Sequence, residues 1–161
     1  MSVKEDNLED EIPQAADFVR SIAEQGYRIE TALADLIDNS IAAGADKIEI
    51  LVNTTRQPFT LYIADNGSGM SEDELKKAMR FPSTSANKHR RQNDLGRFGL
   101  GLKTASFSQT RSFSVISRNK QNRNFSGRTW DLGVLEEYGW KIKVETQKDI
   151  DKVFSDYQDR R

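Results

Sequence analysis

Cysteine is absent from the 161-residue sequence, and histidine occurs only once. Without cysteine the chain can form no disulfide, no thiolate nucleophile and no cysteine-ligated zinc or iron–sulfur cluster. A single histidine also removes most histidine-based metal sites and the familiar Ser-His-Asp triads. The chemistry open to this protein is therefore that of carboxylates, amides, hydroxyls, backbone groups and cations.

Long apolar runs and a strong net charge are missing too. No segment approaches the roughly 18 consecutive apolar residues of a membrane-spanning helix, and residues 1–11 are acidic, unlike a signal peptide. We therefore expect a cytoplasmic protein with no membrane partner. Lysine and arginine total 24 against 25 acidic residues, so the net charge of −1 indicates neither a nucleic-acid nor a membrane partner.

One segment departs from this balance of charge. Residues 111–128 hold no acidic residue but five basic ones: Arg111, Arg118, Lys120, Arg123 and Arg128. Such a run is usually a solvated face, but it also fits a surface that binds a nucleic acid or a protein client. The sequence leaves both interpretations open.

Hydrophobic residues make up 36% of the chain and charged residues 30%, which is typical of a globular protein. With no repeat or linker visible, we expect a single domain over residues 1–161. Periodicity and capping residues predict helices at 13–24, 28–43, 72–79 and 100–107, and strands at 47–52, 59–65, 112–118 and 124–132. This order favours the α/β class, as a two-layer sandwich of a mostly antiparallel sheet covered on one face by helices.

The helix expected at 28–43 has two unequal faces. One face is apolar and predicts core packing; it carries Ile29, Leu33, Leu36, Ile37 and Ile41. On the other, Asp35 and Asn39 lie one turn apart among alanines, where a solvated helix would carry lysine, glutamate or glutamine. Small neighbours leave room for a ligand against these two side chains, although an exposed helix with incidental polar residues also fits.

Two glycine-rich segments complete the informative part of the sequence. In ADNGSGM (64–70), glycines allow a tight turn, and Asp65 stands at the end of a strand where it can accept from a ligand's amino group. In LGRFGLGLKTASFSQ (95–109), three glycines lead into an apolar helix, an arrangement that suits phosphate. Neither segment fits the GxxxxGK[ST] or GxGxxG motif, so a different nucleotide fold is required.

The three segments, in this order, resemble the motifs of the GHKL ATPases, which include the gyrase B subunit, the ninety-kilodalton heat-shock chaperone, histidine kinases, MutL and the MORC proteins. ADLIDNSIAAGA (34–45) is similar to the N box, DNGSGM to the DxGxG box and GRFGLGLK to the second glycine box. The last is nearest in form to the chaperone and MORC branch. The resemblance covers about residues 14–140 and implies a Bergerat ATP-binding fold.

A site for ATP and Mg²⁺ is implied by the same resemblance. Asp65 is expected to accept from the adenine amino group, Gly67, Gly69 and Met70 to line the base, and Asn39 to coordinate Mg²⁺. The residues expected around the phosphates are Gly96, Gly99, Leu100, Gly101, Leu102 and Lys103. A lid over residues 81–95 is expected to bring Ser83, Thr84, Ser85 and Lys88 to the phosphates.

Hydrolysis depends on a general base, and here the sequence departs from the family pattern. Hydrolysing relatives carry a glutamate four residues before the magnesium asparagine, whereas this chain has Asp35, which is one methylene shorter. We also find neither the Gly-Thr pair that usually backs the adenine site nor a second domain with a lysine for the γ-phosphate. We therefore expect an N-terminal fragment of a longer protein, or a divergent short member.

The resulting hypothesis is Mg-ATP binding with slow hydrolysis, in which the nucleotide controls a conformational switch and homodimer formation. A non-hydrolysing ATP-binding regulatory module is the main alternative, because of Asp35 and the missing lysine. A histidine kinase catalytic domain is the weaker one, since no segment with a phosphoacceptor histidine precedes Asp35.

Overall fold

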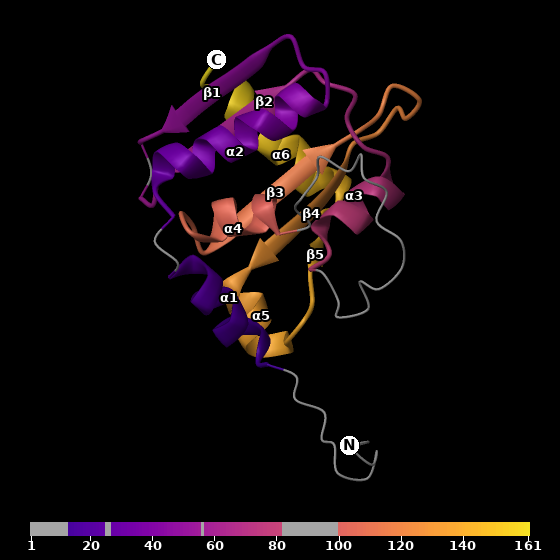
Figure 1. Cartoon of the computed structure of the whole chain (residues 1–161). Coiled ribbons are helices and arrows are strands. Elements are labelled where there is room, and N and C mark those ends of the chain that lie inside the picture. The colour runs from indigo at the N-terminus through magenta and orange to yellow at the C-terminus, as the bar shows by residue number, and fades with distance from the viewer. Residues whose placement is uncertain (1–12, 25–26, 56, 82–99) are drawn as a thin grey trace, which may run out of the picture.

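The computed structural model describes residues 13–24, 27–55, 57–81 and 100–161. Its elements in chain order are α1 (Ala15–Ala23), α2 (Ile29–Ala42), β1 (Ile48–Asn53), β2 (Thr60–Asp65), α3 (Glu72–Met79), α4 (Gly101–Phe107), β3 (Ser112–Ser117), β4 (Ser126–Asp131), α5 (Leu132–Tyr138), β5 (Lys143–Val144) and α6 (Gln147–Gln158). The predicted helices and strands are all confirmed (Figure 1). The last three elements occupy a region for which the sequence predicted none.

The described strands form two antiparallel sheets. β1 pairs with β2 over its whole length, with Ile48 opposite Asp65, and β4 pairs with β3 on one side and β5 on the other. The α/β class and the antiparallel pairing are thus confirmed, but the single expected sheet is divided. β2 does not pair with β3; instead the loop after β2 reaches it, where the Met70 amide donates to Ser117 Oγ at 2.9 Å.

The main hydrophobic core lies between β4 and the helices α1, α3, α4 and α5. It contains Ala15, Ala16, Val19, Leu75, Met79, Phe107, Trp130, Leu132 and Leu135. The indole nitrogen of Trp130 donates to the Met79 carbonyl at 2.8 Å, which ties β4 to the end of α3. At its other end α3 begins with the predicted capping box between Ser71 and Glu74.

Helices cover both faces of the β1–β2 hairpin. On one face Ser40 of α2 donates to Asp65. On the other, Tyr157 of α6 donates to Glu49 at 2.7 Å and its ring lies 5.9 Å from that of Tyr62. Side chains alternate along a strand, so Tyr62 and Asp65 point to opposite faces, and Figure 1 shows α2 in front of the hairpin with α6 behind it. The sequence predicted helices on one face of the sheet only. The helix on the second face, α6, lies in the region for which the sequence predicted no element.

No helix in the part of the chain that the structure describes is long and apolar enough to cross a membrane.

Candidate functional site

Helix α2 turns a different side to the interior than its apolar pattern predicts. Its buried residues are Ala32 and Ser40, whereas Ile29 and Ile41 are 48% and 58% exposed. The helix packs against α4 and the end of β2, and small side chains permit this close approach. The predicted core face is therefore wrong at its two ends, Ile29 and Ile41.

The polar side of α2 carries the predicted pair of site residues. Asp35 is half-buried, and its Oδ2 accepts a hydrogen bond from the hydroxyl of Tyr27. Asn39, one turn further on, is exposed, and no residue within the described ranges hydrogen-bonds to its side chain. The carboxylate is thus partly engaged, while the carboxamide oxygen can still bind a ligand.

Asp65 ends β2, and two donors hold its carboxylate. Ser40 Oγ donates to Oδ2 at 3.0 Å, and the Gly67 amide donates to Oδ1 at 2.9 Å. An ionised carboxylate offers about four acceptor positions, so capacity is left for the amino group of a ligand. The arrangement fits the predicted adenine contact, with the carboxylate already oriented by the protein.

The loop that follows Asp65 is tied on two sides. The Ser68 amide donates to the Ala43 carbonyl at 2.9 Å, which joins the loop to the end of α2. Gly69 has φ +64°, and a Cβ there would lie 1.9 Å from the Arg118 carbonyl oxygen, so only glycine fits. The predicted tight turn is confirmed at Gly69. At Gly67 the reason for glycine is space alone, since a Cβ would lie 2.9 Å from that of Ala43.

Lys103 lies inside the protein, and its ammonium group contacts the end of α3; its predicted contact with the phosphates stays a prediction. The residue is 0% exposed, and Nζ donates to the Ala78 carbonyl at 2.6 Å and lies 5.7 Å from the Phe81 ring centroid. The carbonyl end of a helix favours a cation, but burial lowers the pKa of Lys103 to about 8. Of its predicted neighbours at the phosphates, Leu100 is exposed just before α4, and Gly101 and Leu102 form the first turn of that helix.

Six predicted phosphate contacts fall outside the described residues: Ser83, Thr84, Ser85, Lys88, Gly96 and Gly99. The same holds for the predicted lid, apart from Phe81. These assignments stay predictions.

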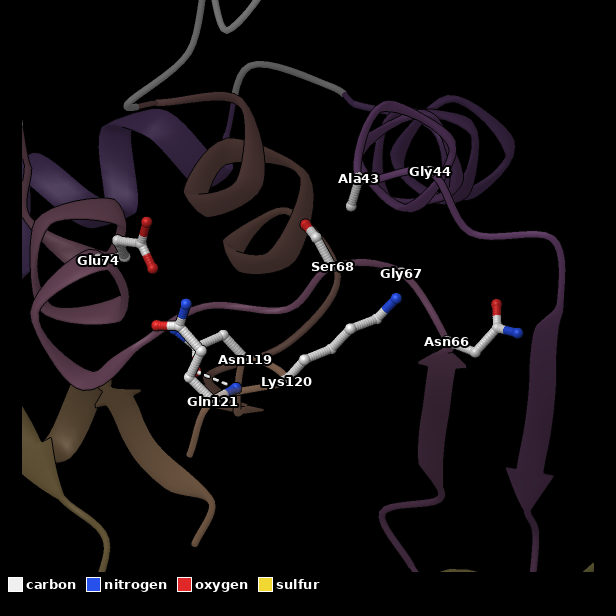
Figure 2. Close-up of a pocket in the computed structure, with 9 residues that line it drawn as sticks. All are labelled: Ala43, Gly44, Asn66, Gly67, Ser68, Glu74, Asn119, Lys120 and Gln121. Atoms are coloured by element: carbon white, nitrogen blue, oxygen red, sulfur yellow. Dashed lines mark hydrogen bonds between the residues drawn. The ribbon is translucent and has the colours of Figure 1, made fainter. Parts of the chain in front are cut away.

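An open hollow of about 510 Å³ lies beside the loop after Asp65. It is lined by Ala43 and Gly44, residues 66–68, Glu74 and the β3–β4 turn at 119–121. Figure 2 shows Lys120 extending from that turn toward the loop. Among the predicted site residues that the structure describes, only Gly67 borders the hollow, which therefore adjoins the group of Asp35, Asn39 and Asp65 without including it.

The basic segment 111–128 does not form one surface. Arg128 is buried and pairs with Glu72 of α3 at 2.8 Å. Arg111 precedes β3, whereas Arg118, Lys120 and Arg123 lie beyond its other end, around the β3–β4 turn. A continuous basic patch is therefore absent among these residues, and binding of a nucleic acid or protein client stays a prediction.

Residues 27–160 match the sequence profile of the family described as histidine kinase-, DNA gyrase B-, and HSP90-like ATPases. The chain belongs to this family. The predicted GHKL membership is thereby confirmed, and the matched range contains every predicted site residue. Membership in this ATPase family implies ATP binding and hydrolysis.

Three relatives illustrate which branches of the family this member resembles. Chaperone protein HtpG of Ruthia magnifica subsp. Calyptogena magnifica is 25% identical over 143 residues, which cover 76% of this chain and 23% of that protein. DNA mismatch repair protein MutL of Persephonella marina is 31% identical over 112 residues, 66% of this chain and 21% of that protein. Protein MICRORCHIDIA 7 of Arabidopsis thaliana is 28% identical over 134 residues, 80% of this chain and 18% of that protein. The chain thus spans less than a quarter of the length of each.

The structure adds two residues that the sequence analysis missed in this ATPase domain. Ser40 follows Asn39 directly. The sequence could have indicated it, because it places a hydroxyl on the side of α2 that also carries the buried Ala32. Tyr27 lies two residues before α2, and its contact with Asp35 depends on how the chain enters the helix. Spacing in the sequence carries no signal for that contact.

Proposed function

We propose that this chain is a single ATP-binding domain that binds Mg-ATP and hydrolyses it slowly, with Asp65 receiving the adenine and Asp35 activating water. The observation that carries the proposal is the Asp65 carboxylate, which Ser40 and the Gly67 amide orient at the end of β2. It combines with membership in a family of ATPases.

The adenine end of the proposed site is formed by the loop after β2. Asp65 accepts from the adenine amino group, while Gly67, Gly69 and Met70 line the base. The hydrogen bond from the Met70 amide to Ser117 Oγ holds this loop against β3, and the absence of a side chain at Gly69 permits the close approach to the Arg118 carbonyl. The site would therefore be shaped before the nucleotide arrives, which lowers the entropic cost of binding.

The magnesium end of the site is proposed to depend on Asn39. No three or more histidine, cysteine or acidic residues in the described ranges are placed so that they could hold a metal ion together, so a Mg²⁺ ion would take its other ligands from phosphate oxygens and water. The exposed carboxamide of Asn39 fits such a site, because one protein oxygen is enough. When bound, Mg²⁺ neutralises charge on the phosphate oxygens.

For the phosphates we propose a supporting role for Lys103. The backbone of Leu100, Gly101 and Leu102 would face the phosphates, while the Lys103 ammonium fixes α4 to the end of α3 through the Ala78 carbonyl. The predicted contacts at 83–85, Lys88, Gly96 and Gly99 and the lid at 81–95 would complete the enclosure. Lid closure and dimerisation on ATP binding form the proposed switch.

Asp35 is the proposed general base. It lies one helical turn before Asn39, so a phosphate near Asn39 would bring its attacking water within reach of the Asp35 carboxylate. The carboxylate takes the proton that water loses as it attacks the γ-phosphorus. Asp35→Asn should retain ATP affinity and reduce turnover by roughly two to four orders of magnitude.

The experiment measures ATP affinity by calorimetry and turnover by phosphate release in the wild type, Asp35→Asn and Asp38→Asn. Asp38 is exposed on the same helix, so its variant controls for loss of one negative charge. Equal turnover in the wild type and Asp35→Asn would remove Asp35 as the base. Intact ATP affinity with no turnover in the wild type would favour the non-hydrolysing module.

A further inference from the structure

Tyr27 is the direct neighbour of Asp35 and has no role yet in the proposed reaction. Its hydroxyl donates to Oδ2 of Asp35, eight residues further along the chain. Both side chains are half-buried, so the contact is not an exposed surface pair. No other hydrogen bond to the Asp35 side chain occurs among the described residues. Among the described residues, Tyr27 is therefore the one that fixes the orientation of this carboxylate by a hydrogen bond.

The position of Tyr27 is itself fixed from a second helix. Gln109, just beyond the end of α4, donates through Nε2 to the Tyr27 carbonyl oxygen at 2.7 Å. The same nitrogen lies 3.0 Å from Ser108 Oγ, which restrains the Gln109 side chain. Helix α2, which carries Asp35, also packs against α4. The backbone of Tyr27 is therefore anchored to the end of the same helix, α4, that supports α2.

The electrostatics keep the Tyr27 hydroxyl a donor. The hydrogen bond to Asp35 raises the pKa of Tyr27 above its usual value, and burial and the negative charge of Asp35 act in the same direction. The phenol therefore stays protonated at neutral pH. A neutral phenol can donate one hydrogen bond, and here it donates that bond to the carboxylate oxygen that faces it, Oδ2 of Asp35.

We infer that Tyr27 is a positioning residue for hydrolysis: by holding Oδ2 of Asp35, it leaves Oδ1 to face the attacking water. The inference rests on the proposed function. The terminal torsion of an aspartate is broad and roughly two-fold, so a carboxylate without a donor samples many orientations. Because Asp35 is one methylene shorter than the glutamate of hydrolysing relatives, it has less reach with which to correct a poor orientation. Holding one oxygen restores the alignment that the reaction needs.

The test is the variant Tyr27→Phe, which removes the hydroxyl and keeps the ring. We expect kcat to fall by about tenfold, the worth of one hydrogen bond to a charged group, with ATP affinity changed by less than about twofold. A purely structural contact would alter thermal stability without this separation of kcat from affinity. Tyr138→Phe is the matched control, because the Glu137 carboxylate likewise raises the pKa of Tyr138, which lies exposed outside the site.

A double-variant cycle ties the effect to Asp35. In the Asp35→Asn background, Tyr27→Phe should cause no further loss of turnover, since there is no base left to position. A tenfold loss in that background, or unchanged kcat in Tyr27→Phe alone, would overturn the inference. A wild-type chain that binds ATP without turnover would also overturn the inference, while the proposed ATP binding would be retained. A wild-type chain that fails to bind ATP would instead reject the proposed function itself.

A measurement that needs neither turnover nor a Tyr27 variant checks the contact directly. The phenol of Tyr27 is titrated by NMR in the wild type and in Asp35→Asn, with Tyr138 as internal reference. We expect the pKa of Tyr27 to fall in Asp35→Asn while that of Tyr138 stays in place, because the charged acceptor is lost. An unchanged Tyr27 titration would show that the two side chains are not bonded in solution, and the inference would fail.

Discussion

Asp65 and Asp35 are both carboxylates of the proposed site, but the protein holds them differently. Asp65 accepts from Ser40 and from the Gly67 amide, within a loop tied to both α2 and β3. Asp35 accepts from the Tyr27 hydroxyl alone among the described residues. The end that would recognise the base is thus fixed by the fold, whereas the end that would activate water depends on one side chain. Affinity and turnover can therefore change separately in this domain.

The largest expected effect comes from neutralising the more firmly held carboxylate. Asp65→Asn removes the charge that strengthens the bond to an amino group, and the new amide can turn an NH₂ donor toward it. We expect ATP affinity in calorimetry to fall by about 100-fold or more. Ser40→Ala, which keeps the charge and removes one of its donors, should cost only about fivefold. Similar losses in both variants would contradict the importance of the charge.

A stability measurement tests how closely the loop after Asp65 packs against the end of β3. Gly69→Ala should lower the free energy of unfolding by about 3 kcal/mol, because the new methyl group meets the Arg118 carbonyl oxygen. Gly44→Ala is the matched control: Gly44 has φ +74° but nothing within 4 Å of an added Cβ. The control should lose about 1 kcal/mol, from backbone strain alone. Equal losses in denaturant unfolding would mean that the loop does not press against β3.

The smallest of the three effects concerns Lys103, the third charged residue of the site region. It appears as a dependence of the free energy of unfolding on pH. Its folded-state pKa is about 8 against a usual value of 10.5, so between these limits the unfolded chain binds more protons and stability rises with pH. From pH 8 to pH 10 this rise should be about 2 kcal/mol. In Lys103→Met the rise should vanish in urea unfolding series. If the rise persisted in that variant, another group would cause it, and the pKa of Lys103 would not be lowered in the folded protein.

The sequence predicted the elements up to β4 because each has a local signal. Ser71 and Glu74 mark the start of α3, and the alternation in β1 and β2 marks the hairpin. Signals for α6 were also present, since Ile150, Val153, Phe154 and Tyr157 follow helical spacing after the capping box of Thr146. By contrast, the division into two sheets depends on how the loop after β2 crosses to β3.

The site shows the same boundary between local and tertiary information. The motifs indicated Asp35, Asn39 and Asp65 by their types and spacing. The donors that orient two of them, Tyr27 and Ser40, depend on helix entry and on the approach of α2 to β2. Lys103 was expected at the phosphates because it follows a glycine-rich turn, whereas its burial depends on tertiary packing that the spacing does not report.

The contact between α6 and the hairpin bears on the order in which the domain assembles. β1 and β2 are near neighbours in the chain, so their pairing needs only a short loop to close. The bond from Tyr157 to Glu49 spans 108 residues and closes the far larger loop. During synthesis the hairpin that ends in Asp65 would emerge early and gain its second covering only when α6 leaves the ribosome. Helix α6 thus completes the support of a site whose motifs are all translated before it.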